Sequence, residues 1–354
     1  MAQIAHFDIH YDRFLNEAGE VEQPLPEFAK DTQTLLSLYK NMVYTRVYDQ
    51  RAIALQRTGQ MGTYASILGQ EAIGAGVGHA MQRQDILAPS YREGGVQFFR
   101  GVKPSELFLY WGGDERGMNF NESRQDFPVA IPIASQACHA VGAAYAMRLR
   151  KQPAVVVCML GDGGTSKGDF YESMNVAGSM QLPVIFVVSN NQWAISVRRT
   201  DQSSCDTLAQ KAIAGGMPGQ QIDGNDVIAV RHYVSSALER ARTGDGPSLI
   251  EAMTYRLGDH TTADDAKRYR SQEEVDLQHK KEPVGRLRNY LIANNLWNDD
   301  KEQALIAKCE EQIETEVEIY LATEVQPAKS MFDHLYATLP KSLQWQRAQL
   351  PGEE

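Results

Sequence analysis

Two apolar runs separated by a helix-length segment constrain the fold of this chain more than any other feature. Residues 154–160 (AVVVCML) and residues 183–189 (PVIFVVS) are rich in β-branched side chains, and the segment between them can form one helix. A strand, a helix and a second strand in this order give two parallel strands. Strands that are apolar throughout are typically covered on both faces. We therefore predict an α/β fold with a mostly parallel sheet covered by helices on both faces.

Polar residues follow each predicted strand. The first run ends in Gly-Asp-Gly, which includes Asp162 and Gly163, and the second ends in Asn190-Asn191, with 26 residues (164–189) between the two motifs. Ligands of open α/β sheets bind at the carboxyl ends of the strands. Carboxylate and amide oxygens suit Mg²⁺ or Ca²⁺, and glycine allows close backbone approach to a bulky group. The pattern resembles the signature of thiamine diphosphate-binding proteins.

Composition excludes several classes of function. The net charge of −10 disfavours nucleic acid as a partner, because phosphate backbones require a basic surface. No apolar run is long enough to span a membrane, and the N-terminus lacks the features of a secretory signal. The four cysteines are scattered and form no CxxC pair, which predicts reduced thiols and a cytoplasmic protein.

The length of 354 residues fits one large domain with helical additions or two domains. We predict an N-terminal arm (1–30), an α/β domain (31–282) and a helical C-terminal extension (283–354). A helix is expected to start after Asp31 and to end at Gly59, and residues 104–127 and the last residues are expected to be irregular. The helices expected at 69–81 and 137–147 are rich in Ala and Gly, which suits either subunit contacts or packing within one domain.

Several further segments resemble the alpha subunits of heterotetrameric 2-oxo acid dehydrogenases. The resemblance covers about residues 36–339, and its blocks are GTYASILGQEA (62–72), SYREGG (90–95), IPIASQACHAVGAAYA (131–146), GDGGTSKGDFYESMNVAG (161–178), NNQWAIS (190–196), TLAQKAIAGGMPGQQIDGND (207–226) and YRLGDHTTADDAKRYR (255–270). It implies a thiamine diphosphate-binding fold with Mg²⁺ as the second cofactor. The blocks favour pyruvate as the substrate, with a branched-chain 2-oxo acid or acetoin as the alternatives.

The resemblance also implies roles for individual residues. Asp162, Asn191 and the main-chain carbonyl of Trp193 match the metal ligands of the family. Tyr91 and Arg92 match a Tyr-Arg pair that grips the diphosphate, and an arginine fork suits phosphate geometry. The diphosphate and water would complete the coordination shell of the metal.

The segment after residue 255 supplies the predicted catalytic residue. His260 matches a histidine that contacts the diphosphate and assists acyl transfer. Asp259 departs from the family pattern, and its carboxylate is expected to favour protonated His260. Ile133 and Gln136 match residues that line the thiamine and substrate cavity. Thr261 stands where animal relatives carry a serine regulated by a kinase, although regulation is not expected here.

The implied activity is the oxidative decarboxylation of a 2-oxo acid with transfer of the acyl group to a lipoyl group. The glutamate that activates thiamine in this family comes from the beta subunit. The chain is therefore expected to form half of an active site, in an assembly of two alpha and two beta chains that serves a lipoyl-bearing acyltransferase. A Mg²⁺-dependent phosphohydrolase that uses Asp162 as nucleophile and a non-enzymatic regulatory subunit are the alternatives. The polar segments 197–206 and 258–272 are expected to order only when cofactor and metal bind.

Overall fold

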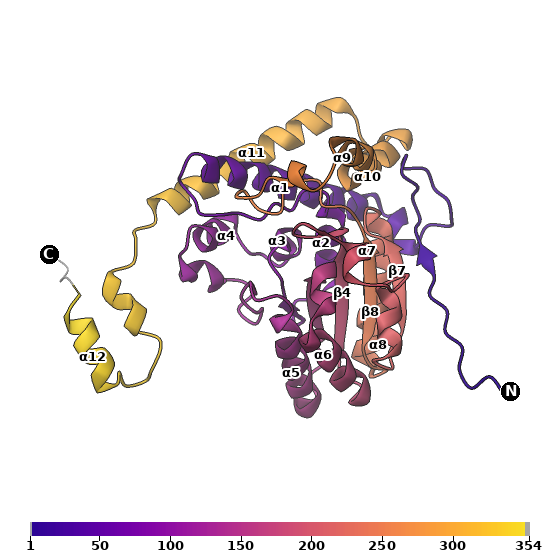
Figure 1. The fold of residues 1–354 in the computed structure, drawn as a ribbon. Helices are drawn as coiled ribbons and strands as arrows, with labels where there is room; N and C mark the ends of the chain where they lie inside the picture. Colours follow the sequence, from indigo (N-terminus) through magenta and orange to yellow (C-terminus); the bar gives the residue numbers. More distant parts are fainter. Residues whose placement is uncertain (1, 351–354) are drawn as a thin grey trace.

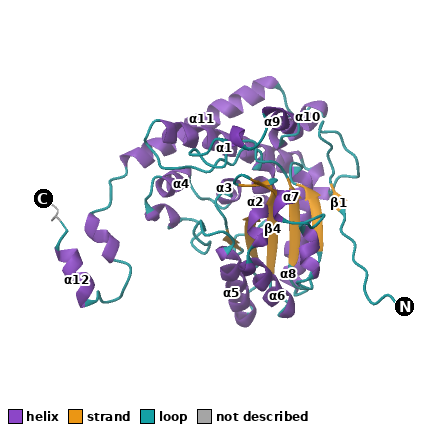
Figure 2. Ribbon diagram, in the orientation of Figure 1, coloured by secondary structure: helices purple, strands orange, loops and turns teal. Residues whose placement is uncertain are grey.

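A computed structural model describes residues 2–350 and contains a six-stranded sheet in which every neighbouring pair is parallel (Figures 1 and 2). The strand order is β1-β7-β8-β4-β3-β2. The strands are β1 (Tyr11–Asp12), β2 (Ile86–Ala88), β3 (Val156–Gly161), β4 (Val184–Asn190), β7 (Gly219–Asp223) and β8 (Ser248–Met253). The short strands β5 (Trp193–Ala194) and β6 (Val197–Arg198) form a separate antiparallel hairpin.

Helices cover both faces of the sheet, as the apolar strands predict (Figure 2). Alternate residues of β3 point to opposite faces: Val156, Cys158 and Leu160 join one buried cluster, whereas Val157 and Met159 join the other. The first cluster is completed by α5 (Ser135–Arg150) and α6 (Gly168–Ser179), and the second by α2 (Glu71–Ala80) and α8 (Val227–Thr243). The predicted α/β fold class is confirmed.

A third cluster lies beyond the carboxyl edge of the sheet and is built from helices at both ends of the chain. Its long helix α1 (Thr32–Arg57) begins after Asp31, whose carboxylate accepts hydrogen bonds from the amides of Gln33 and Thr34, as expected for an N-cap. The other α-helices are α3 (Gly94–Phe99), α4 (Pro104–Trp111), α7 (Arg199–Gln202), α9 (Gln272–His279), α10 (Pro283–Ala293), α11 (Asp299–Ala322) and α12 (Lys341–Ala348). The 3₁₀ helices are η1 (Glu27–Lys30), η2 (Glu115–Met118), η3 (Asp162–Ser166), η4 (Ala209–Ile213), η5 (Ala266–Arg268) and η6 (Ala328–Phe332).

The structure corrects two expectations about local structure and adds one strand that the sequence did not predict. Part of the segment 104–127 is helical, because Pro104 starts α4 and the side chain of Glu106 reaches back to the amide of Lys103. The C-terminal segment contains α12, so it is not irregular throughout. The strand β7 has no counterpart in the prediction, because its sequence, GQQID, is too polar to be recognised as a strand.

The N-terminal segment adds the edge strand β1 to the sheet beside β7. Asp226, the N-cap of α8, fastens the chain that follows β1, because its carboxylate accepts hydrogen bonds from the amides of Phe14 and Leu15 at 2.7 and 2.8 Å. The segment predicted as an arm is therefore partly integrated into the sheet.

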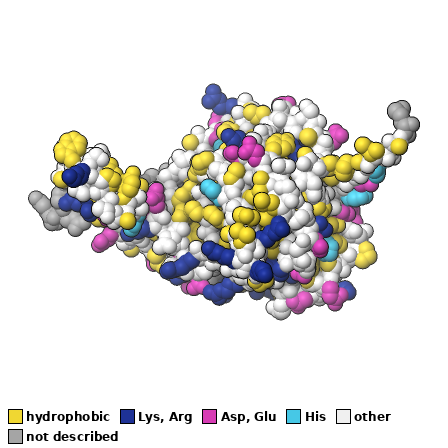
Figure 3. Space-filling view, turned by 90° about the horizontal axis from the view of Figure 1, so that it is seen from below, with side chains coloured by type: hydrophobic (Ala, Val, Ile, Leu, Met, Phe, Trp, Pro, Cys, Tyr) yellow, Lys and Arg dark blue, Asp and Glu magenta, His cyan; other side chains and the backbone are white. Residues whose placement is uncertain are grey.

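The chain after α11 projects from the body of the molecule and carries α12 (Figure 1). Its apolar side chains are largely exposed, and Figure 3 shows them on a projection separate from the rest of the surface. They include Val325, Met331, Leu335, Tyr336 and Trp345. Among the helices of residues 2–350, none combines the length and the apolar character that a membrane span needs.

Candidate cofactor site

Polar residues that follow four neighbouring strands lie close together at the carboxyl edge of the sheet. Asp162 follows β3, Asn191 follows β4, and the segment that contains Tyr91 and Arg92 follows β2. The segment after β8 leads to His260. Because all four strands are parallel and adjacent, their carboxyl ends meet at the same edge.

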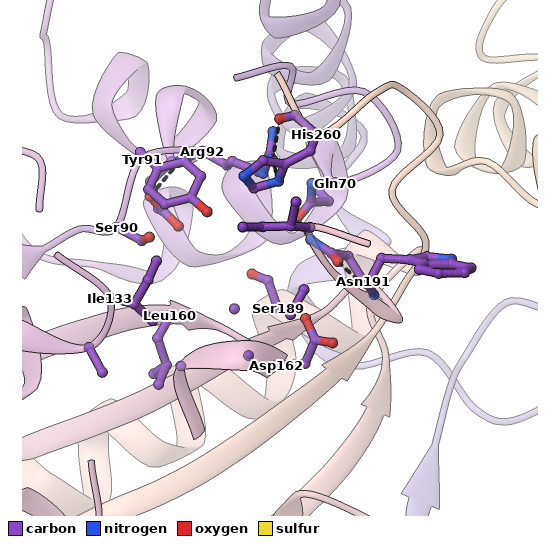
Figure 4. A pocket seen from close by; sticks show the side chains of 18 of the residues that line it. Gln70, Ser90, Tyr91, Arg92, Ile133, Leu160, Asp162, Ser189, Asn191 and His260 are labelled. Carbon is purple, nitrogen blue, oxygen red and sulfur yellow. Dashed lines mark hydrogen bonds between the residues drawn. The ribbon is translucent and has the colours of Figure 1, made fainter. Parts of the chain in front are cut away.

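These segments enclose a cavity of about 210 Å³ (Figure 4). All nine residues that the sequence predicts for the site line this cavity: Tyr91, Arg92, Ile133, Gln136, Asp162, Gly163, Asn191, Trp193 and His260. In Figure 4, Asp162 and Asn191 lie on one side of the cavity, and Arg92 and His260 lie together on another. The structure therefore brings together every residue of the predicted site.

The carboxylate of Asp162 is buried and incompletely paired. Its side chain lies at the start of η3, and the Oδ2 atom is buried without a hydrogen-bond partner among residues 2–350. Burial raises the pKa of this carboxyl group to about 6, although backbone amides of Asp162 and Gly163 and the charges of Arg256 and Arg199 oppose the shift. A buried acceptor without a donor is costly, so the geometry fits a cation that would use this oxygen.

Asn191 and Trp193 provide neutral oxygens near Asp162. The Asn191 amide donates to Gln70 Oε1 at 3.2 Å, and its Oδ1 accepts from the Trp193 amide at 3.3 Å. Gln192, between them, has a left-handed backbone with φ 71°, a strained conformation that is frequent at binding sites. One carboxylate, one amide and one carbonyl suit a hard cation, although no group of three His, Cys, Asp or Glu side chains within residues 2–350 could hold a metal.

The two glycines beside Asp162 serve different purposes. A Cβ at Gly163 would lie 2.7 Å from the Cβ of Ala194, so this position cannot accept a larger residue without movement of the backbone. A Cβ at Gly161 would meet nothing within 4 Å, and Gly161 lines the cavity. The absence of a side chain at Gly161 therefore leaves space into which a bound group can extend.

Arg92 is held by main-chain carbonyls and forms no ion pair with any carboxylate of residues 2–350. Its Nη1 donates to the carbonyl of Ser66, and its Nη2 donates to the carbonyl of His260 at 2.7 Å. The guanidinium also lies over the ring of Tyr91, 5.2 Å from the ring centre. A positive charge without a counter-charge at a cavity wall suits an anionic ligand such as a diphosphate.

The structure corrects the expected protonation state of His260. Burial and the charges of Arg92 and Arg256 together lower the pKa of its imidazole to about 4, against the opposing effect of Asp264. The Asp259 carboxylate instead accepts from the amide of Ala266 at 3.0 Å. The expectation that Asp259 favours protonated His260 is therefore wrong.

The neighbours of His260 also indicate its tautomer. Its Nδ1 faces Nη2 of Arg92 at 3.1 Å and Nη1 of Arg256 at 3.4 Å. Since guanidinium groups only donate, Nδ1 must accept, and the proton of the neutral ring lies on Nε2.

Ile133 and Gln136 line the opposite part of the cavity at the start of α5. Ile133 is exposed, whereas Gln136 is buried and donates from Nε2 to the carbonyl of Met159 at 2.8 Å. The Oε1 atom of Gln136 is buried, and no described residue of the chain donates a hydrogen bond to it. This acceptor is available to a donor group of a ligand.

Sequence analysis missed three polar residues that shape the site. Gln70 and Glu93 line the cavity, and burial raises the pKa of Glu93 to about 7. Arg256 is wholly buried, and it donates to the carbonyls of Trp193 at 3.3 Å and Ile195 at 2.8 Å. All three stand inside the quoted sequence blocks, so the signal was their position within the resemblance.

Comparisons with known proteins agree with this geometry. Residues 39–329 match the family model described as the dehydrogenase E1 component. This chain belongs to that family. It is 40% identical to the pyruvate dehydrogenase E1 component subunit alpha of Staphylococcus aureus (strain Mu50), over 94% of this chain and 90% of the relative. It is 42% identical to the 3-methyl-2-oxobutanoate dehydrogenase subunit alpha of Mycobacterium tuberculosis (strain H37Rv), over 91% of this chain and 88% of the relative.

A third relative extends the comparison. The chain is 37% identical to the pyruvate dehydrogenase E1 component subunit alpha of Mycoplasma genitalium, over 94% of this chain and 93% of the relative. The predicted family is thus confirmed, and membership places the chain among the thiamine diphosphate-dependent 2-oxo acid dehydrogenases.

Proposed function

We propose that this chain is the alpha subunit of a pyruvate dehydrogenase, which binds thiamine diphosphate through Mg²⁺ at the carboxyl edge of its sheet. The observation that carries this proposal is the buried, unpartnered Oδ2 of Asp162 in a cavity lined by all nine predicted site residues. A phosphohydrolase is disfavoured by the family match, and a non-enzymatic subunit is disfavoured because every predicted site residue lines one cavity.

Asp162, Asn191 and the carbonyl of Trp193 would hold Mg²⁺. Asp162 supplies the anionic oxygen, and the other two supply neutral oxygens that leave positions for diphosphate oxygens. When bound, thiamine diphosphate supplies the stabilisation of a carbanion that decarboxylation of a 2-oxo acid requires. The protein contributes the positions of the groups and the electrostatic environment.

Arg92 and Tyr91 would grip the diphosphate, and His260 would contact it and assist acyl transfer. Burial and the two guanidinium groups beside His260 keep the ring neutral, with its proton on Nε2. His260 would therefore act as a hydrogen-bond donor through Nε2, rather than as a cation. This role follows from the burial of the ring among positive charges.

The partner would be a beta chain that supplies the activating glutamate. Asp162 and Glu93 are the carboxylates among the residues that line the cavity, and Glu93 already accepts from the Arg92 amide at 2.8 Å. Ile133 and Ile195 line the cavity and are exposed, as are Ile131 and Val197, each two residues away in the sequence. The helices α5 and α6 also leave Tyr145, Leu149 and Tyr171 exposed. The helix α2 is almost wholly buried within this chain, so its small residues serve internal packing.

Pyruvate is the proposed substrate, because the sequence blocks favour it and two of the relatives carry that name. A branched-chain 2-oxo acid is the second candidate, supported by the Mycobacterium tuberculosis relative at 42% identity. Substrates that differ by a methylene group are discriminated by roughly 1–3 kcal/mol in an apolar pocket. The acceptor would be the lipoyl group of an acyltransferase.

The test compares the chain alone with the chain co-expressed with the beta chain from the same genome. Oxidation of pyruvate, 3-methyl-2-oxobutanoate and acetoin is measured as the reduction of an artificial electron acceptor, with and without thiamine diphosphate and Mg²⁺. We expect turnover only for the assembled enzyme with both cofactors, and the highest kcat/KM for pyruvate. Full activity of the chain alone would contradict the half-site proposal.

The proposed domain division is an arm (1–30), a cofactor-binding domain (31–282) and a helical extension (283–354). It is supported by the separate helical cluster beyond the sheet and by the projecting chain after α11. We also propose a cytoplasmic location. It is supported by the four cysteines, which all lie within residues 2–350 and form no disulfide there, as is usual in a reducing compartment.

A further inference from the structure

A buried lysine outside the cavity lining has no role in the proposed function. Lys211 lies in η4 with only 5% of its surface exposed, and it forms no ion pair with any carboxylate of residues 2–350. Its Nζ donates to the carbonyl oxygen of Thr165 at 2.9 Å and to Thr165 Oγ1 at 3.0 Å. Burying an ammonium group without a counter-charge is costly, so these two bonds must be maintained by the surrounding fold.

Thr165 connects this lysine to the metal-binding turn. Thr165 is 1% exposed, and its hydroxyl donates to the carbonyl of Asp162 at 2.7 Å. The hydroxyl thus accepts from Lys211 and donates to Asp162, which forms a continuous chain of hydrogen bonds from η4 to η3. The chain fixes the backbone that carries the Asp162 carboxylate.

The same 3₁₀ helix is also connected to the strand that carries Asn191. Glu251, a fully buried residue of β8, accepts from the Ala209 amide at 2.9 Å and from Asn190 Nδ2 at 2.6 Å. Ala209 is the first residue of η4, and Asn190 immediately precedes Asn191. Both segments that carry side-chain oxygens for the metal are therefore fastened to η4, one through Lys211 and one through Glu251.

We propose that Lys211 is a positioning residue that, through Thr165, sets the Asp162 turn relative to Asn191 for divalent-metal binding. The proposal deepens the proposed function and rests on it. Groups that orient metal ligands from outside typically affect metal affinity by roughly 10–100-fold when they are removed. Lys211→Met is therefore expected to weaken divalent-metal binding by about that factor.

The test measures Mn²⁺ binding to the enzyme assembled with its beta chain, at saturating thiamine diphosphate, from the electron paramagnetic resonance signal of free Mn²⁺. The variants are Lys211→Met, Thr165→Val, their combination and Thr165→Ser. Thr165→Val should weaken Mn²⁺ binding, whereas Thr165→Ser keeps the hydroxyl and should bind as the wild type does. The double variant should lose less than the product of the two single losses, because both residues act through one chain of bonds.

Thr45→Val is the matched control. Thr45 is fully buried in α1, and within the part of the chain that the structure describes its hydroxyl has no hydrogen-bond partner. The substitution therefore removes a buried hydroxyl of the same kind without breaking the chain from Lys211 to Asp162. Its Mn²⁺ affinity should equal that of the wild type.

The outcomes separate this inference from the proposed function. If Lys211→Met and Thr165→Val lower the melting temperature but leave Mn²⁺ affinity at the wild-type value, the residues are merely structural and the inference is overturned. If Lys211→Met fails to fold, the nearly isosteric Thr165→Val decides the question. If the wild type fails to bind Mn²⁺, or Asp162→Ala retains wild-type affinity, the proposed metal site itself is wrong, and the inference is overturned with it.

Discussion

The cavity has a wall made by strand ends and a wall made by loops, and the two walls hold their side chains by different means. Asp162 and Asn191 follow buried strands directly, so the packing of β3 and β4 fixes their positions. Arg92 and His260 lie in segments without regular structure and are fixed by hydrogen bonds instead. Arg92 donates to the carbonyls of Ser66 and His260, and the His260 amide donates to the Asp264 carboxylate at 2.8 Å. The strand-end wall carries the negative charge and the loop wall the positive charges.

Two buried arginines, Arg256 and Arg270, support the segments of the loop wall through hydrogen bonds. Arg270 donates to the carbonyls of Arg256, Leu257 and Gly258, and Arg256 donates to the carbonyl of Ile195 and to the hydroxyl of Tyr269. The segment 258–272 therefore has more internal support than its polar sequence indicates. Its dependence on cofactor and metal for full order stays a prediction.

The largest expected effect comes from the strand-end wall. Asp162→Ala should reduce Mg²⁺-dependent thiamine diphosphate affinity by more than about 100-fold, because removal of outer groups alone costs roughly 10–100-fold. Calorimetric titration of the assembled enzyme measures the loss. Asp226→Asn is the matched control, because burial also raises the pKa of Asp226 to about 6 but its carboxylate caps α8. The control should lose stability and keep cofactor affinity.

As the pH falls, protonation of Asp162 in the strand-end wall should precede protonation of His260 in the loop wall. Because the pKa of Asp162 is raised to about 6, protons compete with the metal below that pH, and metal affinity should fall about tenfold per pH unit well below it. In the absence of metal the sign is opposite: the stability that Asp162 contributes is present below its unfolded pKa and is lost as pH rises through about 6. Metal titrations and thermal melts between pH 5 and 8 in about half-unit steps test both signs. A pH-independent metal affinity would contradict this assignment.

His260 in the loop wall should remain neutral across the same range. Its pKa is lowered to about 4, so the stability that it contributes is present above its unfolded pKa and is lost as pH falls toward 4. Nitrogen-15 spectra of labelled histidine should show a neutral ring protonated on Nε2 at pH 6. Arg92→Met removes one of the two facing charges and should raise the pKa of His260. An imidazolium signal at pH 6 in the wild type would refute the proposed electrostatics.

Arg270→Met tests whether the hydrogen bonds from Arg270 to main-chain carbonyls hold the segment 258–272 in place. The substitution leaves two buried carbonyls and the partly buried carbonyl of Gly258 without this donor, which should cost about 1–3 kcal/mol and should accelerate amide exchange in 258–272. Exchange measured with and without thiamine diphosphate and Mg²⁺ also tests cofactor-dependent ordering. Equal, strong protection of the wild-type segment in both states would show that the loop is already formed without ligand.

The smallest effects are expected at two adjacent threonines of the loop wall. Thr262 Oγ1 accepts from the Tyr64 amide at 3.0 Å, and the Thr262 amide donates to the Tyr64 carbonyl at 2.8 Å. Thr261 Oγ1 only accepts from the Ala263 amide at 3.3 Å. Thr262→Val should cost about 1 kcal/mol, and Thr261→Val less than about 0.5 kcal/mol, in chemical denaturation. The reverse order would show that Thr261 has a role that its contacts do not explain.

The sequence by itself determined the fold class, the family and nine of the residues that line the cavity. Apolar runs of the right length impose buried parallel strands, and the polar residues after each strand must then meet at one edge. This is why Asp162 and Asn191, which are far apart in the chain, could be paired before the structure was described. This reasoning does not extend to Arg92 and His260, because loop segments carry no periodic pattern. These two residues were located only through the resemblance to the family.

Only the tertiary structure decided the electrostatics of the site. The neighbour of His260 in the sequence is Asp259, but its neighbours in space are Arg92 and Arg256, and they reverse the expected charge of the ring. The roles of Lys211 and Glu251 likewise depend on contacts between segments that are distant in the sequence. A pKa or a hydrogen bond depends on burial and distance, and neither is encoded by the order of the residues alone.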